Sequence, residues 1–133
     1  MRSSAAVIAA ACLLAGCGTA DDREQARGVV ERFYAAVEAG RGEEACALLS
    51  PAAADQLESQ TGQSCDGVIT RLELAGGGVA DVHVYAVGAK VDVRGGESAF
   101  LSRAPGRWQL TAIGCRPAAG PPTETPMDCE VEA

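Results

Sequence analysis

The sequence predicts an α+β domain in which N-terminal helices pack on one face of an antiparallel sheet of about four strands. Two observations indicate this class: apolar residues recur at three- and four-residue spacing in the first half of the chain, and at two-residue spacing in the second. Several cysteines add a third, because they can tie so small a domain together with disulfides. At 133 residues the chain has room for one domain.

Residues 1–16 are predicted to be a signal peptide. Arg2 precedes an uninterrupted apolar run over residues 5–14. As a helix this run rises about 15 Å, roughly half of a bilayer core, so it is typical of an export signal rather than of a membrane span.

The sequence Leu14-Ala15-Gly16-Cys17 follows, and it resembles the lipobox of bacterial lipoproteins. The resemblance implies that the Cys17 thiol is joined to diacylglycerol and that a peptidase cuts before this residue. It also implies a lipid-anchored protein on the extracytoplasmic face of the cell membrane. Ordinary secretion, with cleavage at another small residue, is the alternative.

The net charge of the chain indicates which classes of partner it can bind. Eleven basic and eighteen acidic residues give a net charge of −7, so we expect no direct binding of nucleic acid. Arginine is used almost to the exclusion of lysine, a bias typical of a high-GC bacterial genome. With its lipobox, the chain resembles small predicted lipoproteins of high-GC Gram-positive bacteria. The expected membrane contact is the acylated Cys17.

The elements are expected in the following order. Asp21 and Asp22 should cap a first helix whose apolar stripe runs from Ala26 to Val37, and Gly40 should end it. A second short helix is predicted near residues 43–49, a third over 51–57 and one or two further turns after 64. Alternation predicts strands that begin near 82, 89, 98 and 107, and it directs Val82, Val84 and Ala86 to the core.

The mature chain therefore divides into three parts: a lipidated tether over 17–21, the domain over 22–115 and a proline-rich tail over 116–133. The cysteines left after processing and acylation are Cys46, Cys65, Cys115 and Cys129. Four cysteines allow three connectivities. We favour the local one, 46 with 65 and 115 with 129, in which each bond stabilises by about 3 kcal/mol.

Metal and cofactor sites are not expected. No pair of cysteines has CxxC spacing, and His83 is the single histidine, so the ligand spacing of a zinc site is missing. Phosphate-binding, dinucleotide-binding and nucleophile motifs are likewise missing from the sequence.

Three segments resemble the nuclear transport factor 2-like superfamily. They are Val29-Val30-Glu31-Arg32-Phe33-Tyr34-Ala35-Ala36-Val37, Ala45-Cys46-Ala47-Leu48-Leu49-Ser50-Pro51 and the strand Gly106-Arg107-Trp108-Gln109-Leu110-Thr111-Ala112-Ile113-Gly114-Cys115. The resemblance implies a curved sheet wrapped around a long N-terminal helix to form a cone. Enzymes of this superfamily place Asp, Tyr or His inside the cone.

Asp81, His83 and Tyr85 share one face of a predicted strand and are the candidate catalytic set. The alternative is that this face is solvated, and it is favoured because the apolar alternate residues should be the buried ones. Asp92 is interpreted in the same way, as a surface residue, and Trp108 as a core residue.

The expected function is that of a non-enzymatic envelope lipoprotein that binds a small ligand or an envelope protein. One alternative is a cone-fold isomerase or hydrolase that uses Asp81, His83 and Tyr85. The other is an accessory subunit of a transporter or of a cell-wall complex.

Overall fold

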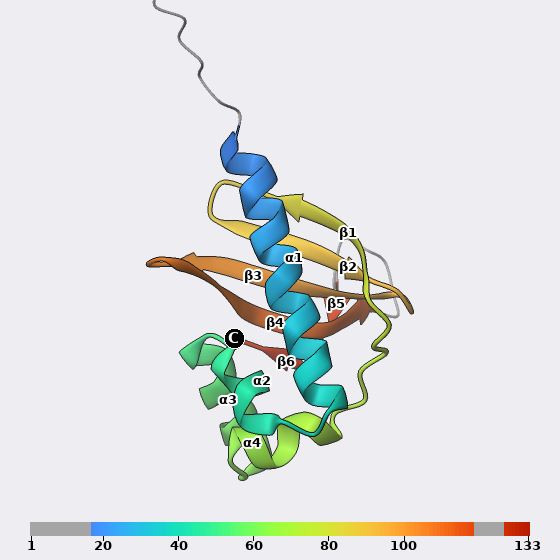
Figure 1. Cartoon of the computed structure of the whole chain (residues 1–133). Coiled ribbons are helices and arrows are strands. Elements are labelled where there is room, and N and C mark those ends of the chain that lie inside the picture. The colour runs from blue at the N-terminus through green and yellow to red at the C-terminus, as the bar shows by residue number, and fades with distance from the viewer. Residues whose placement is uncertain (1–16, 119–126) are drawn as a thin grey trace, which may run out of the picture.

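The computed structural model describes residues 17–118 and 127–133, in which helices come first and antiparallel strands follow (Figure 1). The helices are α1 (Cys17–Glu38), α2 (Gly42–Ala47), α3 (Pro51–Thr61), α4 (Cys65–Val68) and the 3₁₀ helix η1 (Ile69–Arg71). The strands are β1 (Val79–Val84), β2 (Gly88–Val93), β3 (Glu97–Ala104), β4 (Arg107–Pro117), β5 (Met127–Asp128) and β6 (Val131–Glu132). The α+β class is confirmed. The long α1 crosses one face of the sheet, and the short helices lie near the C-terminal end of α1.

The first helix begins earlier than predicted. It starts at Cys17, so Asp21 and Asp22 lie within its first turns instead of capping it, and residues 17–21 are helical. No proline stops the helix here, and packing of its later turns on the sheet supports the whole element. Gly40, with φ of 73°, lies just beyond its end as predicted, because a left-handed residue closes a helix at little cost in glycine.

The short helices are confirmed with shifted ends. Ser50 caps α3, its hydroxyl oxygen accepting from the Ala53 N–H at 3.2 Å, and Pro51 occupies the first helical position. The helix then runs to Thr61 rather than stopping near residue 57. A disulfide between Cys46 and Cys65 joins α2 to α4, as the local connectivity predicts.

Strands β1 to β4 form an antiparallel meander in chain order. Val82 pairs with Val91, and His83 pairs with Lys90, so side chains alternate between the two faces as the two-residue period predicts. The prediction for Ala86 is wrong. Strand β1 ends at Val84, and Ala86 is exposed in the β1–β2 turn.

The tail adds two strands that the sequence did not indicate. Strand β5 pairs with Arg116 and Pro117, and β6 pairs with Ala112 and Ile113, so the sheet has six strands rather than about four. Four prolines lie in the tail over 116–133, and proline lacks the N–H that a strand uses in the sheet. Both segments follow the last proline, however, and the disulfide between Cys115 and Cys129 holds them against β4.

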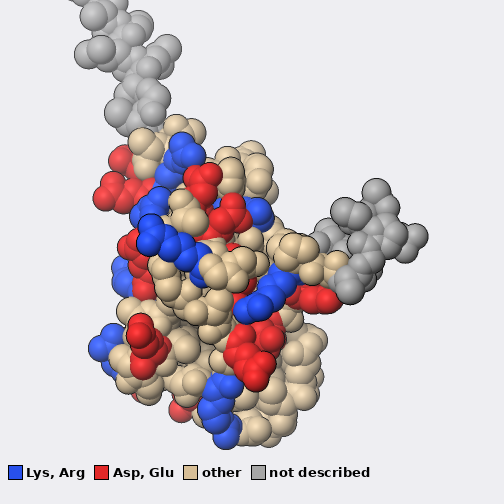
Figure 2. All heavy atoms as spheres, turned by 90° about the vertical axis from the view of Figure 1, so that its right-hand side faces the viewer, with Lys and Arg blue, Asp and Glu red and all other residues tan. Residues whose placement is uncertain are grey.

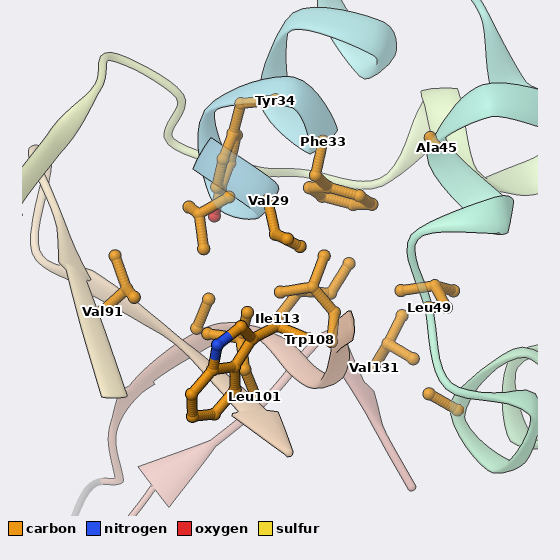
Figure 3. Packing of buried hydrophobic residues seen from close by; sticks show 14 of the residues in the cluster. Val29, Phe33, Tyr34, Ala45, Leu49, Val91, Leu101, Trp108, Ile113 and Val131 are labelled. Carbon is orange, nitrogen blue, oxygen red and sulfur yellow. The ribbon is translucent and has the colours of Figure 1, made fainter. Parts of the chain in front are cut away.

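The core lies between α1 and the inner face of the sheet (Figure 3). Phe33 and Val30 of α1 are fully buried, as are Leu110 and Ile113 of β4. The predicted stripe of α1 therefore faces the sheet. Trp108 is 4% exposed, which agrees with its interpretation as a core residue.

Candidate functional site

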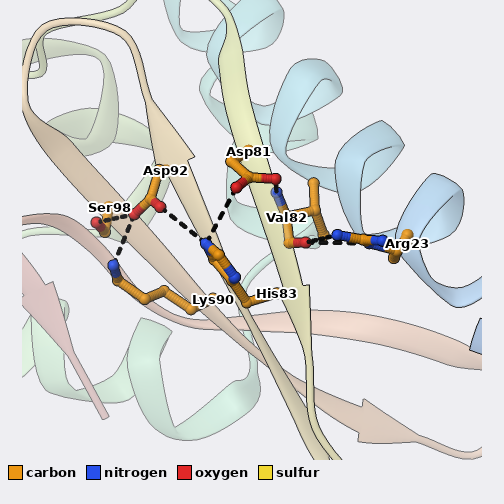
Figure 4. Close-up of polar contacts among 7 residues, drawn as sticks. All are labelled: Arg23, Asp81, Val82, His83, Lys90, Asp92 and Ser98. Carbon is orange, nitrogen blue, oxygen red and sulfur yellow. Dashed lines mark hydrogen bonds and ion pairs between the residues drawn. The ribbon is translucent and has the colours of Figure 1, made fainter.

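Two residues of the predicted polar trio, Asp81 and His83, lie close together on the outer face of the sheet (Figure 4). His83 Nε2 lies 3.4 Å from an Asp81 oxygen and 3.2 Å from an oxygen of Asp92 on β2. Tyr85 follows the strand, is 59% exposed and takes part in neither contact. The structure thus brings together Asp81 and His83, adds Asp92, and leaves Tyr85 outside the cluster.

Asp92 is the centre of this outer cluster. Lys90 Nζ lies 2.7 Å from one carboxylate oxygen, and the Ser98 hydroxyl donates to the same oxygen at 2.9 Å. The hydrogen bond from Lys90 is the main cause that holds the pKa of Asp92 below its ordinary value, against the opposing effect of burial, and Ser98 and His83 add to the lowering.

The outer cluster is open to water. The side chains of His83 and Asp81 are 44% and 58% exposed, and that of Asp92 is 31% exposed. Acid–base sites gain much of their strength from the exclusion of water. Among residues 17–118 and 127–133 no three His, Cys, Asp or Glu side chains are placed to hold a metal ion. The arrangement is therefore that of a surface ion-pair network.

A second polar cluster lies inside the protein and involves a carboxylate that the sequence analysis missed. The side chain of Glu97 has 0% exposure. Its oxygens accept from the Tyr34 hydroxyl at 2.5 Å and from the Ala75 N–H at 3.0 Å, and Arg116 Nη2 lies 3.4 Å away. Burial, and then the bond to Glu97, raise the pKa of Tyr34 well above its ordinary value.

The buried carboxylate joins α1, the loop before β1 and strands β3 and β4. Its donors satisfy it, so it acts as a structural polar contact between these elements. Alternation along β3 could have indicated its position, because Glu97, Ala99 and Leu101 share the inner face. Strand β3 begins at Glu97, one residue before the predicted start near residue 98.

A groove runs over the helices on another face of the molecule. Two adjoining recesses, of about 390 and 560 Å³, share Arg32, Ala47 and Leu48. We call their union the α1–α2 groove; its lining is Glu24, Gln25, Gly28, Val29, Arg32, Ala35, Ala36, Arg41, Glu44, Ala47, Leu48, Gly106, Arg107 and Trp108. Both recesses open to solvent, with small and apolar side chains between charged ones.

Gly28 lies in the wall of the groove, in the middle of α1. A Cβ placed on it would meet no atom of residues 17–118 and 127–133 within 4 Å, so the packing of this described part of the chain does not use the glycine. Gly42, at the start of α2, differs because a Cβ there would lie 2.3 Å from the Asp66 carbonyl oxygen. Close packing therefore requires glycine at 42, whereas the folded chain does not require it at 28. A mid-helix glycine costs about 1 kcal/mol relative to alanine.

Charges of both signs surround these features. On the face drawn in Figure 2, acidic and basic side chains are interspersed over the described residues. In the lining of the groove, Arg41 Nε lies 2.9 Å from a Glu44 oxygen, and elsewhere on α1 Arg27 pairs with Glu31 at 3.9 Å. Local mixed charge, rather than a field of one sign, characterises this surface.

Compared with known protein families, curated proteins and solved structures, the chain matches none. The likeness to the cone superfamily therefore remains a sequence resemblance.

The predicted anchor lies at the edge of the described structure. Cys17 is the first residue of α1, and residues 1–16, with the predicted signal peptide, lie outside the described residues. Within the described residues no helix has the length and apolar character needed to cross a bilayer.

Proposed function

We propose that this chain is a lipid-anchored, extracytoplasmic binding module of the cell envelope. Two features support the location. The lipobox sequence ends at Cys17, and the two disulfides are of the kind that persists in an oxidising compartment outside the cytoplasm. Acylation at Cys17 would attach the membrane to the first residue of α1.

We further propose that the domain is a small member of the cone fold implied by the resemblance. The packing of α1 on the inner face of an antiparallel meander supports this. Here the space between helix and sheet is filled by side chains such as Phe33, Leu101 and Trp108 (Figure 3). The proposed binding surface is therefore the outer α1–α2 groove and not the interior of the cone.

The observation that carries the binding proposal is Gly28. A glycine in the middle of α1 lowers the stability of the helix, and the packing of the described residues does not require it. Gly28 also lines the groove. Glycine is the residue that allows another molecule to approach a backbone closely. A partner seated against α1 at this point would account for it.

The chemistry of the groove favours a protein segment as the occupant. Ala35, Ala47 and Leu48 give the groove an apolar lining. Side chains of both charges, among them Arg32 and Glu24, line it as well. A helix or strand of an envelope protein with a ridge of small apolar residues and flanking charges of both signs fits these features. This proposal gives Asp81, His83 and Tyr85 no catalytic role.

The anchor is tested by growing the source bacterium with a radiolabelled fatty acid. The wild type should carry label and Cys17→Ala should not. Equal labelling of the two would contradict the lipid anchor.

The groove is tested by photo-crosslinking in intact cells, with a benzophenone amino acid in place of Gln25. We expect an adduct with one envelope protein, mapped to a segment of the chemistry described above. Gly28→Gln, which fills the groove, should abolish the adduct. Ala52→Gln, on the exposed side of α3, is the matched control and should leave it intact. An adduct that survives Gly28→Gln, or maps to a second copy of this chain, would overturn the proposed site.

The accessory-subunit alternative is decided by the same experiment. It gains support if the crosslinked protein is a component of a transporter or of a cell-wall synthetic complex, and it loses support if the protein belongs to neither.

A further inference from the structure

The β1–β2 turn is an apolar projection on the surface. Val87 is 78% exposed and Tyr85 is 59% exposed, and these two are the exposed large hydrophobic side chains of the described chain. Ala86 between them is also exposed. We call residues 85–87 the apolar tip. These three consecutive residues at the end of one hairpin form a small apolar surface that is open to water.

The apolar tip lies beside the first turns of α1 (Figure 1). Arg23 donates through Nε and Nη2 to the Val82 carbonyl oxygen at 3.1 and 3.0 Å, which fixes the end of β1 against the helix. Arg103 of β3 connects the turn to α1 by two further contacts. Its backbone N–H donates to the Val87 carbonyl oxygen at 3.2 Å, and its guanidinium pairs with Asp22.

These contacts hold the apolar tip at a fixed height relative to Cys17. The Tyr85 N–H donates to the Gly88 carbonyl oxygen at 2.7 Å and closes the turn. From Cys17 to Arg23 the helix rises about 9 Å. The tip therefore lies at the end of the domain where the chain of residues 1–16 joins α1.

We infer that the apolar tip is a second membrane contact, which enters the interface between lipid headgroups and acyl chains when Cys17 is acylated. This inference rests on the proposed anchor, since the acyl chains bring that end of the domain to the bilayer. Tyrosine suits the headgroup level because its ring is apolar and its hydroxyl can stay hydrated, and valine suits the acyl boundary. The covalent anchor already retains the protein, so the contact sets the orientation of the domain rather than its affinity.

An orientation set in this way has a consequence for the groove. With one acylated residue alone, the domain could rotate about its attachment point. A second contact on a hairpin tied to α1 removes part of that freedom, so the α1–α2 groove would face the same direction on every copy. Orientation of this kind favours docking with another membrane-held protein.

The test uses the full chain, purified with its native acyl groups and reconstituted in phosphatidylcholine–phosphatidylglycerol vesicles. Val87→Trp places an indole at the apolar tip, and its fluorescence is compared in vesicles with brominated and unbrominated acyl chains. Arg94→Trp, in the exposed turn at the other end of β2, is the matched control and carries the same preference of tryptophan for membranes. The wild type gives the background from the single buried Trp108.

We expect brominated lipid to quench Val87→Trp, because its indole would lie at the headgroup–acyl boundary, and to leave Arg94→Trp and the wild type nearly unchanged. Equal quenching of the two variants, or quenching of neither, overturns the inference. In the latter case an apolar pocket of a partner protein becomes the alternative for the tip. The intact mass of the purified protein separates this failure from failure of the anchor: a diacylglycerol adduct without quenching refutes the tip contact alone, and no adduct refutes the anchor.

Discussion

Replacing Tyr34 with phenylalanine removes a single oxygen from the interior and leaves Glu97 without its closest donor. The Tyr34 hydroxyl lies 2.5 Å from a Glu97 oxygen, and the Glu97 side chain has 0% exposure. Among the residues that the structure describes, no comparable donor is left for that oxygen, since the Ala75 N–H and Arg116 bond the other one. The variant keeps the ring, so the edge-on contact of its ring with Phe33 should survive.

The expected loss of stability is about 2 kcal/mol, because a hydrogen bond to a charged group contributes about 1.5–3 kcal/mol and a buried acceptor is left unsatisfied. For a domain of this size the melting temperature should fall by about 8 °C. Tyr85→Phe is the matched control. Tyr85 is 59% exposed, so its hydroxyl should contribute less than about 0.5 kcal/mol.

The effect should also depend on pH in a defined direction. Burial and the bond to Glu97 raise the pKa of Tyr34 in the folded protein above its ordinary value near 10. The stability from this protonated hydroxyl is therefore complete below about pH 10. Above that pH it is lost, because the unfolded chain releases the proton and the folded chain keeps it. At pH 11 the difference in the free energy of unfolding between the wild type and Tyr34→Phe should therefore be smaller by about 1.4 kcal/mol than at pH 8.

The measurement is urea unfolding at pH 8 and pH 11 with the disulfides intact, followed by the fluorescence of Trp108. Glu97→Gln and the double variant complete a mutant cycle, in which the coupling between the two residues should exceed about 1 kcal/mol. Equal stability of wild type and Tyr34→Phe at pH 8, or a difference between them that does not shrink at pH 11, would refute the assigned contact.

Three further predictions concern backbone and covalent constraints. Gly42→Ala should destabilise by about 1–3 kcal/mol in urea unfolding, because its Cβ would lie 2.3 Å from the Asp66 carbonyl oxygen. Gly28→Ala should raise stability by about 0.5–1 kcal/mol in the same assay, and a loss would mean that the folded domain itself uses this glycine. Removing the Cys46–Cys65 bond by a double alanine substitution should lower stability by about 3 kcal/mol, since the bond spans a separation of 19 residues; an unchanged unfolding midpoint would show that the bond adds no stability.

Local patterns account for what the sequence predicted well. The apolar stripe from Ala26 to Val37, the Ser50-Pro51 helix start and the alternation around Val91 each depend on residues within one element. The two-residue strands β5 and β6 could not be predicted in this way. They are too short to show a period, and their pairing with β4 depends on the disulfide from Cys115.

In the candidate sites, too, local patterns predicted the exposure of single residues, whereas the contacts between strands could not be predicted. Alternation indicated that Asp81 and His83 would be solvated, and both are exposed. It did not indicate that Asp92 and Lys90 would join them, which follows from the register between β1 and β2. Glu97 was missed because a charged residue beside a glycine turn is typical of a loop.

The α+β class, the order of the main elements and the inward face of α1 could be predicted from the period of the chain. The set of cysteines that form disulfides was predicted from the lipobox resemblance, which assigns Cys12 to the signal peptide and Cys17 to lipid. The partners of Glu97, the groove beside Gly28 and the position of the β1–β2 turn next to the start of α1 depend on the tertiary structure. Such features join residues that are dozens of positions apart, and they are set by how helix and sheet pack on each other.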